Sequence, residues 1–227
     1  MKLLVFFLFS TMLITFASCI EIIDDLTLNN DGSGSYNYTI NLSSSKVKIN
    51  SILLLDSLDG KKVPSLTEIA EKLERIANTL TKEEGISNVK FQSDYTNYIV
   101  KIRLNFSSLA SLQASIKKIV KQENEGKAIP SLDDAWLIFK NDTLVRSIPQ
   151  ITIEKASQIN MQETRLLKEG RYTSITRFDK EIKFIENENA KISKSNKAVM
   201  VQINPYKLTQ NAHLLDNTIV LKSKLSH

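Results

Sequence analysis

The most chemically distinctive residue of this chain is Cys19, its only cysteine. It follows the basic start Met1-Lys2 and a largely apolar run from Leu3 to Phe16, and two small residues directly precede it. A basic start, a short apolar run and small residues before a processing site are the layout of an export signal. A cysteine at that junction can be acylated by lipid. The sequence therefore predicts a signal peptide over 1–18 and lipidation of Cys19.

The segment Phe16-Ala17-Ser18-Cys19 resembles the lipobox of bacterial lipoproteins, with Phe16 where leucine is usual. An ordinary signal cleaved after Ala17 and a retained membrane anchor stay open as alternatives. The apolar run is shorter than the ~20 residues that cross hydrocarbon, which argues against a retained anchor. A solitary cysteine would leave a secreted protein with a reactive thiol, which argues against the ordinary signal. Without a second cysteine, no disulfide forms within the chain.

Histidine, the usual base of hydrolases, occurs only at His213 and His227. A serine hydrolase would have to use His213, and no Gly-x-Ser-x-Gly elbow accompanies it. A zinc site needs three or four clustered ligands, which two distant histidines do not supply. We therefore expect no enzyme activity, no metal site and no cofactor.

Adjacent or near-adjacent carboxylates occur at Asp24-Asp25, Asp56/Asp59 and Asp133-Asp134. Glycosidase chemistry needs two carboxylates held across a cleft, a geometry that sequence does not establish. We interpret all three pairs as solvated, although Asp24-Asp25 loosely resembles the acidic surface-export signal of some Bacteroidota lipoproteins. The segment Asn29–Gly34 lacks the flanking ligands of a calcium loop, so we interpret it as a structural turn in which Gly32 or Gly34 needs positive φ.

Three tyrosines, Tyr36, Tyr38 and Tyr98, lie on or next to expected strands. Aromatic side chains along one face of a sheet can line a groove for a ligand. Tyrosine on a half-buried sheet also serves simple packing. Both interpretations are kept, with these residues as the candidate ligand-binding set.

The composition is that of an ordinary globular protein, with 42% hydrophobic and 24% charged residues. Six glycines and four prolines are too few for long low-complexity linkers. The formal net charge is +5, but the lysines are scattered along the chain. We interpret them as solvated faces and expect no nucleic-acid partner.

The first half of the chain alternates between strand and helix patterns. Residues 20–28 and 36–42 predict a β-hairpin, because apolar residues recur at every second position on both sides of the turn. The capping pair Ser65 and Glu68 begins a helix that Gly85 ends. Two strands, Ile86 to Gln92 and Tyr98 to Phe106, and a helix from Ser107 or Ser108 follow. Residues 46–55 could add a further strand.

This order, β-β-α-β-β-α, predicts an α+β fold in which two or three helices pack on an antiparallel sheet. The second half is less regular. It contains a predicted hairpin over 136–148, a helix candidate over 151–169, and predicted strands at 171–178, 180–186, 198–204 and 218–222. We expect one domain over 19–227, with a possible sub-boundary near 124–134, and we expect the late strands to join the first sheet.

The order of lipobox cysteine, strand, Asp31-Gly32-Ser33-Gly34 turn, aromatic strand and helix resembles LppM-type envelope lipoproteins. The Gly85-Ile86 strand, the segment Phe106-Ser107-Ser108-Leu109, and the later segments 172–178 and 216–219 also fit this pattern, which looks especially like uncharacterised lipoproteins of Bacteroidota. The resemblance implies an α+β lipoprotein whose sheet holds an amphiphile, and it carries over no catalytic residues.

The sequence thus predicts a lipid-anchored cell-envelope protein that serves as a binding or accessory module. Its expected partners are the membrane, through the acylated Cys19, and an envelope protein or amphiphile. An amphiphile- or glycan-binding protein is the alternative, and an enzyme that uses carboxylates is the third. Ile20 is not the aspartate that retains many proteobacterial lipoproteins in the inner membrane, which favours the outer membrane.

Overall fold

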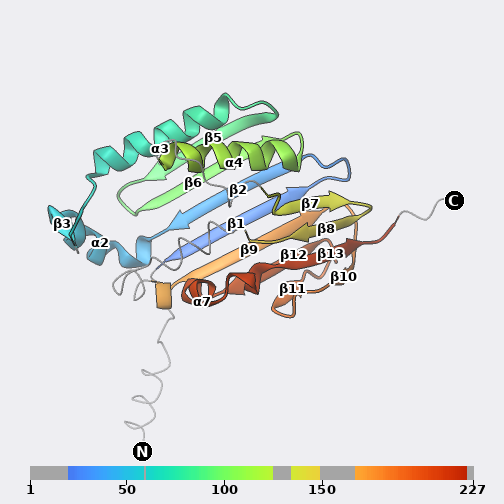
Figure 1. Ribbon diagram of the computed structural model, residues 1–227. Coiled ribbons are helices and arrows are strands. Elements are labelled where there is room, and N and C mark those ends of the chain that lie inside the picture. Colours follow the sequence, from blue (N-terminus) through green and yellow to red (C-terminus); the bar gives the residue numbers. More distant parts are fainter. Residues whose placement is uncertain (1–19, 59, 125–133, 149–166, 224–227) are drawn as a thin grey trace, which may run out of the picture.

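The computed structural model describes residues 20–58, 60–124, 134–148 and 167–223 (Figure 1). Cys19 and the predicted signal peptide therefore lie outside the described residues. The described helices are η1 (Ser43–Ser45), α2 (Lys46–Leu53), α3 (Leu66–Thr81), α4 (Leu109–Glu123), α7 (Pro205–Gln210) and η3 (Ala212–Leu215). The helix candidate over 151–169 and the sub-boundary near 124–134 fall almost entirely outside the described ranges, and the one-domain organisation stays a prediction.

A seven-stranded sheet forms the body, in the order β11-β12-β9-β1-β2-β6-β5. Its strands are β1 (Glu21–Leu28), β2 (Gly34–Asn41), β5 (Ile86–Asp94), β6 (Ile99–Phe106), β9 (Arg171–Phe178), β11 (Ala190–Ile192) and β12 (Ala198–Ile203). All neighbouring pairs are antiparallel except β1 and β9, which run parallel from Glu21 opposite Arg171 to Leu28 opposite Phe178. The sheet is therefore mixed, and the wholly antiparallel expectation was wrong in this one pair. Alternation within a strand reports which face is buried, and it carries no information on the direction of a distant partner.

A smaller antiparallel sheet packs beside the helices, in the order β10-β13-β8-β7. It consists of β7 (Leu137–Lys140), β8 (Thr143–Arg146), β10 (Ile182–Ile185) and β13 (Asn217–Leu221), and a separate short pair is formed by β3 (Ser57–Leu58) and β4 (Lys61–Lys62). The predicted hairpin and the four predicted late strands are confirmed. Two of those late strands, β9 and β12, join the first sheet as expected, whereas β10 and β13 join the smaller one.

Helices α3 and α4 begin where the sequence predicted. Ser65 accepts a hydrogen bond from the backbone N–H of Glu68, whose carboxylate in turn accepts from the backbone of Ser65. Ser108 and Ser111 form the equivalent box for α4. Each box satisfies backbone N–H groups that would otherwise lack partners in the first turn of the helix.

Residues 46–55 form helix α2 and its C-terminal turn, not the strand that we considered. Asn41, the last residue of β2, accepts a hydrogen bond from the backbone N–H of Ser43 at 3.0 Å, which turns the chain out of the sheet. Ile49, Ile52 and Leu53 are half-buried at the i, i+3, i+4 spacing of a helix. A short apolar run does not distinguish a strand from a helix by periodicity alone.

The Asn29–Gly34 turn joins β1 to β2 and satisfies its own polar groups. Asp31 accepts hydrogen bonds from the backbone N–H and the hydroxyl of Ser33, at 2.9 and 2.7 Å. Gly32 has a φ of 84°, as predicted for one of the two glycines. Gly34 is needed for space, because a Cβ there would lie 1.9 Å from the carbonyl oxygen of Thr27.

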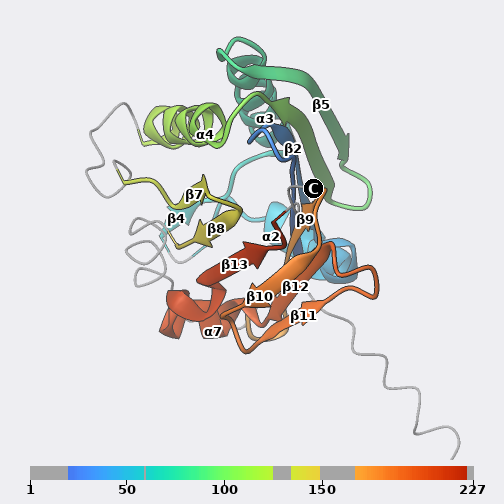
Figure 2. The same ribbon diagram turned by 90° about the vertical axis from the view of Figure 1, so that its right-hand side faces the viewer.

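One face of the large sheet carries the core. Figure 2 shows α3, α4 and the small sheet on the same side of the large sheet. The buried side chains of this core come from the large sheet, the helices and the small sheet. They include Leu26, Leu28, Leu104 and Phe106 from the large sheet, Leu80, Leu109 and Leu112 from the helices, and Leu144, Ile219 and Leu221 from the small sheet. The opposite face is more polar, with an ion pair between Arg177 and Asp25 at 2.9 Å. This is the one-sided burial expected for an antiparallel sheet with one solvated face.

Candidate functional site

A buried charged cluster lies on the core face of the large sheet, centred on Asp24. Asp24 is only 3% exposed and occupies the middle of β1, opposite Tyr38 of β2 and Ser174 of β9. Its neighbour Asp25 points to the other face. The interpretation of Asp24-Asp25 as a solvated pair was therefore wrong for Asp24, because the pleat of a strand sends adjacent side chains to opposite faces. Asp56 and Asp134 are exposed, whereas Asp59 and Asp133 lie outside the described residues.

One oxygen of the Asp24 carboxylate is fully engaged. Oδ2 accepts hydrogen bonds from the guanidinium of Arg146 and from the hydroxyl of Tyr172, the latter at 2.7 Å. Arg146 ends β8 in the small sheet, and its side chain is 12% exposed. The other oxygen, Oδ1, is buried and has no hydrogen-bond partner among the described residues. A buried acceptor without a donor destabilises the folded protein. A ligand that donates a hydrogen bond from an O–H or N–H group to Oδ1 would therefore stabilise the cluster.

Two of the three predicted tyrosines border this cluster. The rings of Tyr36 and Tyr38 stack with centroids 6.4 Å apart and an interplanar angle of 20°. Tyr98 lies elsewhere: it precedes β6, whose Ile102 faces Tyr38, so it lies about 13 Å farther along the strand. There its hydroxyl donates to Asn50 of α2. The structure thus brings Tyr36 and Tyr38 together beside Asp24 and separates Tyr98 from them.

Electrostatics keep the hydroxyls of this cluster protonated. Burial, followed by the charge of Asp24, raises the pKa of Tyr38 to about 12 and raises the pKa values of Tyr36 and Tyr172 well above the ordinary value. Burial alone would lower the pKa of Arg146, but the carboxylate of Asp24 and the nearby tyrosines raise it. The three phenols of the cluster are therefore neutral at neutral pH, beside the ion pair of Asp24 and Arg146. Such groups donate and accept hydrogen bonds, and these phenols do not act as bases.

The position of Arg146 depends on a polar side chain in helix α4. The amide of Gln113 accepts hydrogen bonds from the backbone N–H groups of Trp136 and Leu137, at 2.8 and 3.0 Å, and donates to the carbonyl of Leu137. Leu137 begins β7 and faces Arg146 across the β7–β8 pair. Gln113, which is buried, therefore fixes the strand pair that carries Arg146 over the large sheet.

The sequence held a signal for Asp24 and none for Arg146. Asp24 shares the parity of Ile22, Leu26 and Leu28, so alternation alone places its side chain among the buried residues of β1. Arg146 is separated from Asp24 by more than a hundred residues. Nothing local marks it as the partner, because ion pairing between strands of different sheets is set by tertiary packing.

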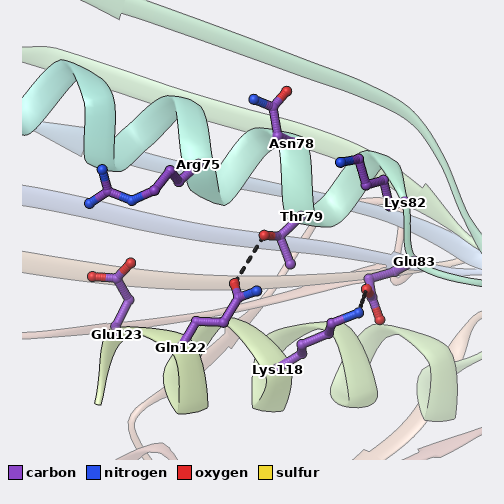
Figure 3. Close-up of a pocket in the computed structure, with 8 residues that line it drawn as sticks. All are labelled: Arg75, Asn78, Thr79, Lys82, Glu83, Lys118, Gln122 and Glu123. Carbon is purple, nitrogen blue, oxygen red and sulfur yellow. Dashed lines mark hydrogen bonds and ion pairs between the residues drawn. The ribbon is translucent and has the colours of Figure 1, made fainter. Parts of the chain in front are cut away.

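A hollow of about 570 Å³ lies between α3 and α4 (Figure 3). Its lining is polar, and side chains contact each other across it: Thr79 of α3 donates to Gln122 of α4 at 2.9 Å, and Lys118 of α4 forms an ion pair with Glu83, which follows α3. Because Gln122 and Lys118 are exposed and each pairs with a residue across the hollow, we interpret it as the solvated seam of two packed helices.

Another hollow, of about 510 Å³, is lined in part by His213, the one internal histidine. Its Nδ1 lies 2.7 Å from Oδ2 of Asp216, whose Oδ1 accepts from the backbone N–H of Ile148. Ser147 lines the same hollow, but no hydrogen bond between its hydroxyl and His213 is found among these described residues. The pair is largely exposed and lacks the positioned nucleophile that acyl transfer needs.

No helix in the described part of the chain is long and apolar enough to cross a membrane. Within the same residues, no cluster of three or more histidine, cysteine or carboxylate side chains could hold a metal ion.

Comparisons with known proteins yield one structural likeness. No protein-family model matches the chain, and no curated protein matches it. Among solved structures, the chain is similar to the NMR structure of the folded domain of LppM from Mycobacterium tuberculosis, with 10% sequence identity, a TM-score of 0.41, and coverage of 91% of this chain and 92% of that one. With this identity and this TM-score, the likeness assigns neither a family nor a function to the chain.

Proposed function

We propose that this protein is a lipid-anchored component of a bacterial cell envelope that acts by binding. The anchor rests on Cys19, which lies two positions before the first residue of β1. Because β1 is an inner strand of the large sheet, an acyl group on Cys19 would hold the folded body directly at the membrane. Ile20 after the cysteine favours the outer membrane, and the turn motifs favour a lipoprotein of the kind that Bacteroidota carry.

The binding role rests on one observation: a buried, unpaired oxygen of Asp24 beside the stacked rings of Tyr36 and Tyr38. Aromatic faces pack against apolar or ring-shaped ligand groups, while a carboxylate oxygen accepts from a hydroxyl or an amine. A few placed polar groups within a mostly apolar lining are typical of small-molecule sites. This chemistry favours a hydroxylated amphiphile or a glycan as ligand.

We favour binding over catalysis because the tyrosine hydroxyls of the cluster, whose pKa values are raised, are not available as general bases. The three phenols keep their protons, and Oδ2 of Asp24 is occupied by Arg146 and Tyr172. We therefore expect no turnover of ester, peptide or glycoside substrates. A reproducible activity that His213→Ala abolished, in a variant with unchanged circular dichroism, would contradict this expectation.

The anchor is tested by metabolic labelling with a fatty-acid analogue in a bacterial host that processes lipoproteins. The wild-type chain should carry the label and fractionate with envelope membranes. Cys19→Ala should lose both properties, because no other cysteine can accept the acyl group. Label retained by Cys19→Ala would refute the lipid anchor.

The binding site is tested with protein purified from envelope membranes in mild detergent and examined by native mass spectrometry. We expect a co-purified amphiphile or glycan whose occupancy falls severalfold in Tyr38→Ala. Asn37→Ala is the matched control, because Asn37 lies next to Tyr38 on β2 and points to the opposite face. Equal occupancy in the two variants would show that the ligand binds elsewhere.

A further inference from the structure

Helix α2 lies at the end of the large sheet nearest to Cys19. β1 begins there at Glu21, and β2 ends there at Asn41, which pairs with Glu21. Figure 1 shows α2 beyond this end of the sheet. A chain spans at most about 3.6 Å per residue, so the Cα atom of Glu21 lies within about 7 Å of that of Cys19. If Cys19 is acylated, as the proposed function requires, this end of the sheet faces the bilayer at close range.

The helix is attached to this end by hydrogen bonds. The backbone N–H of Leu42, just before η1, donates to the carbonyl of Tyr98 at 3.0 Å. The hydroxyl of Tyr98 donates to Asn50 in the middle of α2. Half-buried Ile49, Ile52 and Leu53 lie on the helix at the spacing of a single inward face. The orientation of α2 is therefore fixed, and its other face is presented outward.

The outward side of α2 and of the turn that follows it carries strongly exposed apolar side chains. Val47 and Leu54 are 81% and 86% exposed, the highest values among the large apolar side chains of the described residues. They are seven positions apart, which places them on one side of the helix about 10 Å from each other. Leu55, which follows, is 46% exposed. Scattered exposed apolar residues need no explanation, but three of them on and directly after one short helix beside a membrane anchor do.

The charge of the helix fits the surface of a bilayer. α2 contains Lys46 and Lys48 and no acidic residue. Lysines that flank an apolar face are the pattern of helices that lie in the plane of a membrane interface, where they meet anionic headgroups. A protein partner would need no such arrangement next to the acylated residue. The anchor, the apolar face and the lysines all indicate the same occupant.

We infer that α2, through Val47, Leu54 and Leu55, docks on the bilayer into which the acyl chain of Cys19 inserts. A single lipid chain gives only marginal membrane binding, so a second contact strengthens the attachment. Two contacts also fix the orientation. The Asn29–Gly34 turn, at the far end of the eight-residue strand β1, then lies about 27 Å from the membrane end.

The test uses the full chain, produced in the lipoprotein-processing host, with Leu54→Cys as a labelling site. Because acylation occupies Cys19, the new thiol is the one that takes an environment-sensitive fluorophore. The labelled protein is reconstituted into vesicles of phosphatidylethanolamine and phosphatidylglycerol that carry nitroxide lipids. We expect a blue-shifted emission that the nitroxides quench severalfold more strongly than the emission of a label at Asn30→Cys, in the distal turn.

Two further changes separate docking from general effects. Val47→Asp in the Leu54→Cys background should remove most of the blue shift and the quenching. Phe184→Asp changes an exposed apolar residue on β10, away from α2, and should leave both unchanged. Because Leu54 and Val47 are largely exposed, neither substitution disturbs the core, and circular dichroism verifies the fold.

Each outcome has one meaning. A fatty-acid label on the protein together with an unquenched probe at position 54 overturns the docking and leaves the anchor standing. A blue-shifted probe that lipid nitroxides do not quench also overturns it, since a second copy or another protein then covers the helix. Absence of the fatty-acid label refutes the lipid anchor at Cys19, and it also refutes the orientation of the protein on the bilayer that is inferred from that anchor.

Discussion

Removal of the guanidinium of Arg146 should be one of the most damaging single changes in this protein. In Arg146→Met the carboxylate of Asp24, with a side chain only 4% exposed, keeps the hydrogen bond from Tyr172 and loses its charge partner. Breaking a buried ion pair from one side typically costs about 3–5 kcal/mol, because it leaves a buried charge without compensation. The total free energy of unfolding of a globular domain is about 5–15 kcal/mol, so the variant should lose a large share of its stability.

The double variant Asp24→Asn with Arg146→Met distinguishes two quantities: the penalty for one buried charge without a partner, and the net contribution of the ion pair to stability. It removes both charges, while the amide oxygen introduced at position 24 can still accept a hydrogen bond from Tyr172. Replacing a buried pair with neutral groups is often neutral or stabilising, so we expect the double variant to recover most of the loss. The coupling energy between the two positions should therefore be at least about 2 kcal/mol.

The assay is urea unfolding of residues 20–227, followed by far-ultraviolet circular dichroism, for the wild type, the two single variants and the double variant. Unchanged denaturant slopes would show that the differences reflect stability rather than a change in the unfolded state. The reasoning is refuted if Arg146→Met costs less than about 1 kcal/mol, or if the two single losses simply add in the double variant.

Three smaller predictions concern the supports of the fold. Gly34→Ala should lower the free energy of unfolding by about 3 kcal/mol, because the added Cβ would overlap the backbone of Thr27. Gly32→Ala should lower it by about 1 kcal/mol, because alanine is strained at positive φ. A lower urea midpoint for Gly32→Ala than for Gly34→Ala would contradict this. Gln113→Leu should lower the free energy of unfolding by about 2–4 kcal/mol, because two backbone N–H groups lose their acceptor. Gln122→Leu, on the exposed side of α4, should change it by no more than about 0.5 kcal/mol. Folding raises the pKa of Tyr38 to about 12. The protonated side chain of Tyr38 therefore contributes fully to the free energy of unfolding below its ordinary pKa near 10, and this contribution is lost as the pH rises toward 12. Between about pH 10 and about pH 12, the free energy of unfolding of Tyr38→Phe should therefore fall less than that of the wild type, and equal falls would contradict the assignment.

Local patterns in the sequence were sufficient for most of the individual elements. The alternation in residues 20–42 predicted the hairpin, and the capping residues Ser65 and Ser108 predicted the starts of α3 and α4. These features depend on neighbours within a few residues, which is why they can be read from the chain. The α+β class followed from their order, and the lipobox-like segment around Cys19 is a local motif of the same kind.

Tertiary structure alone decided the partners of those elements. The parallel pairing of β1 with β9 and the placement of β8 over the large sheet join segments more than a hundred residues apart. Helix α2 shows the same limit, because its short apolar run fits a strand or a helix until the turn at Asn41 directs it out of the sheet. From the sequence we interpreted Asp24 as solvated, and the tertiary structure buries it. A buried carboxylate is tolerable only with a charge partner, and packing supplied Arg146 from a distant strand.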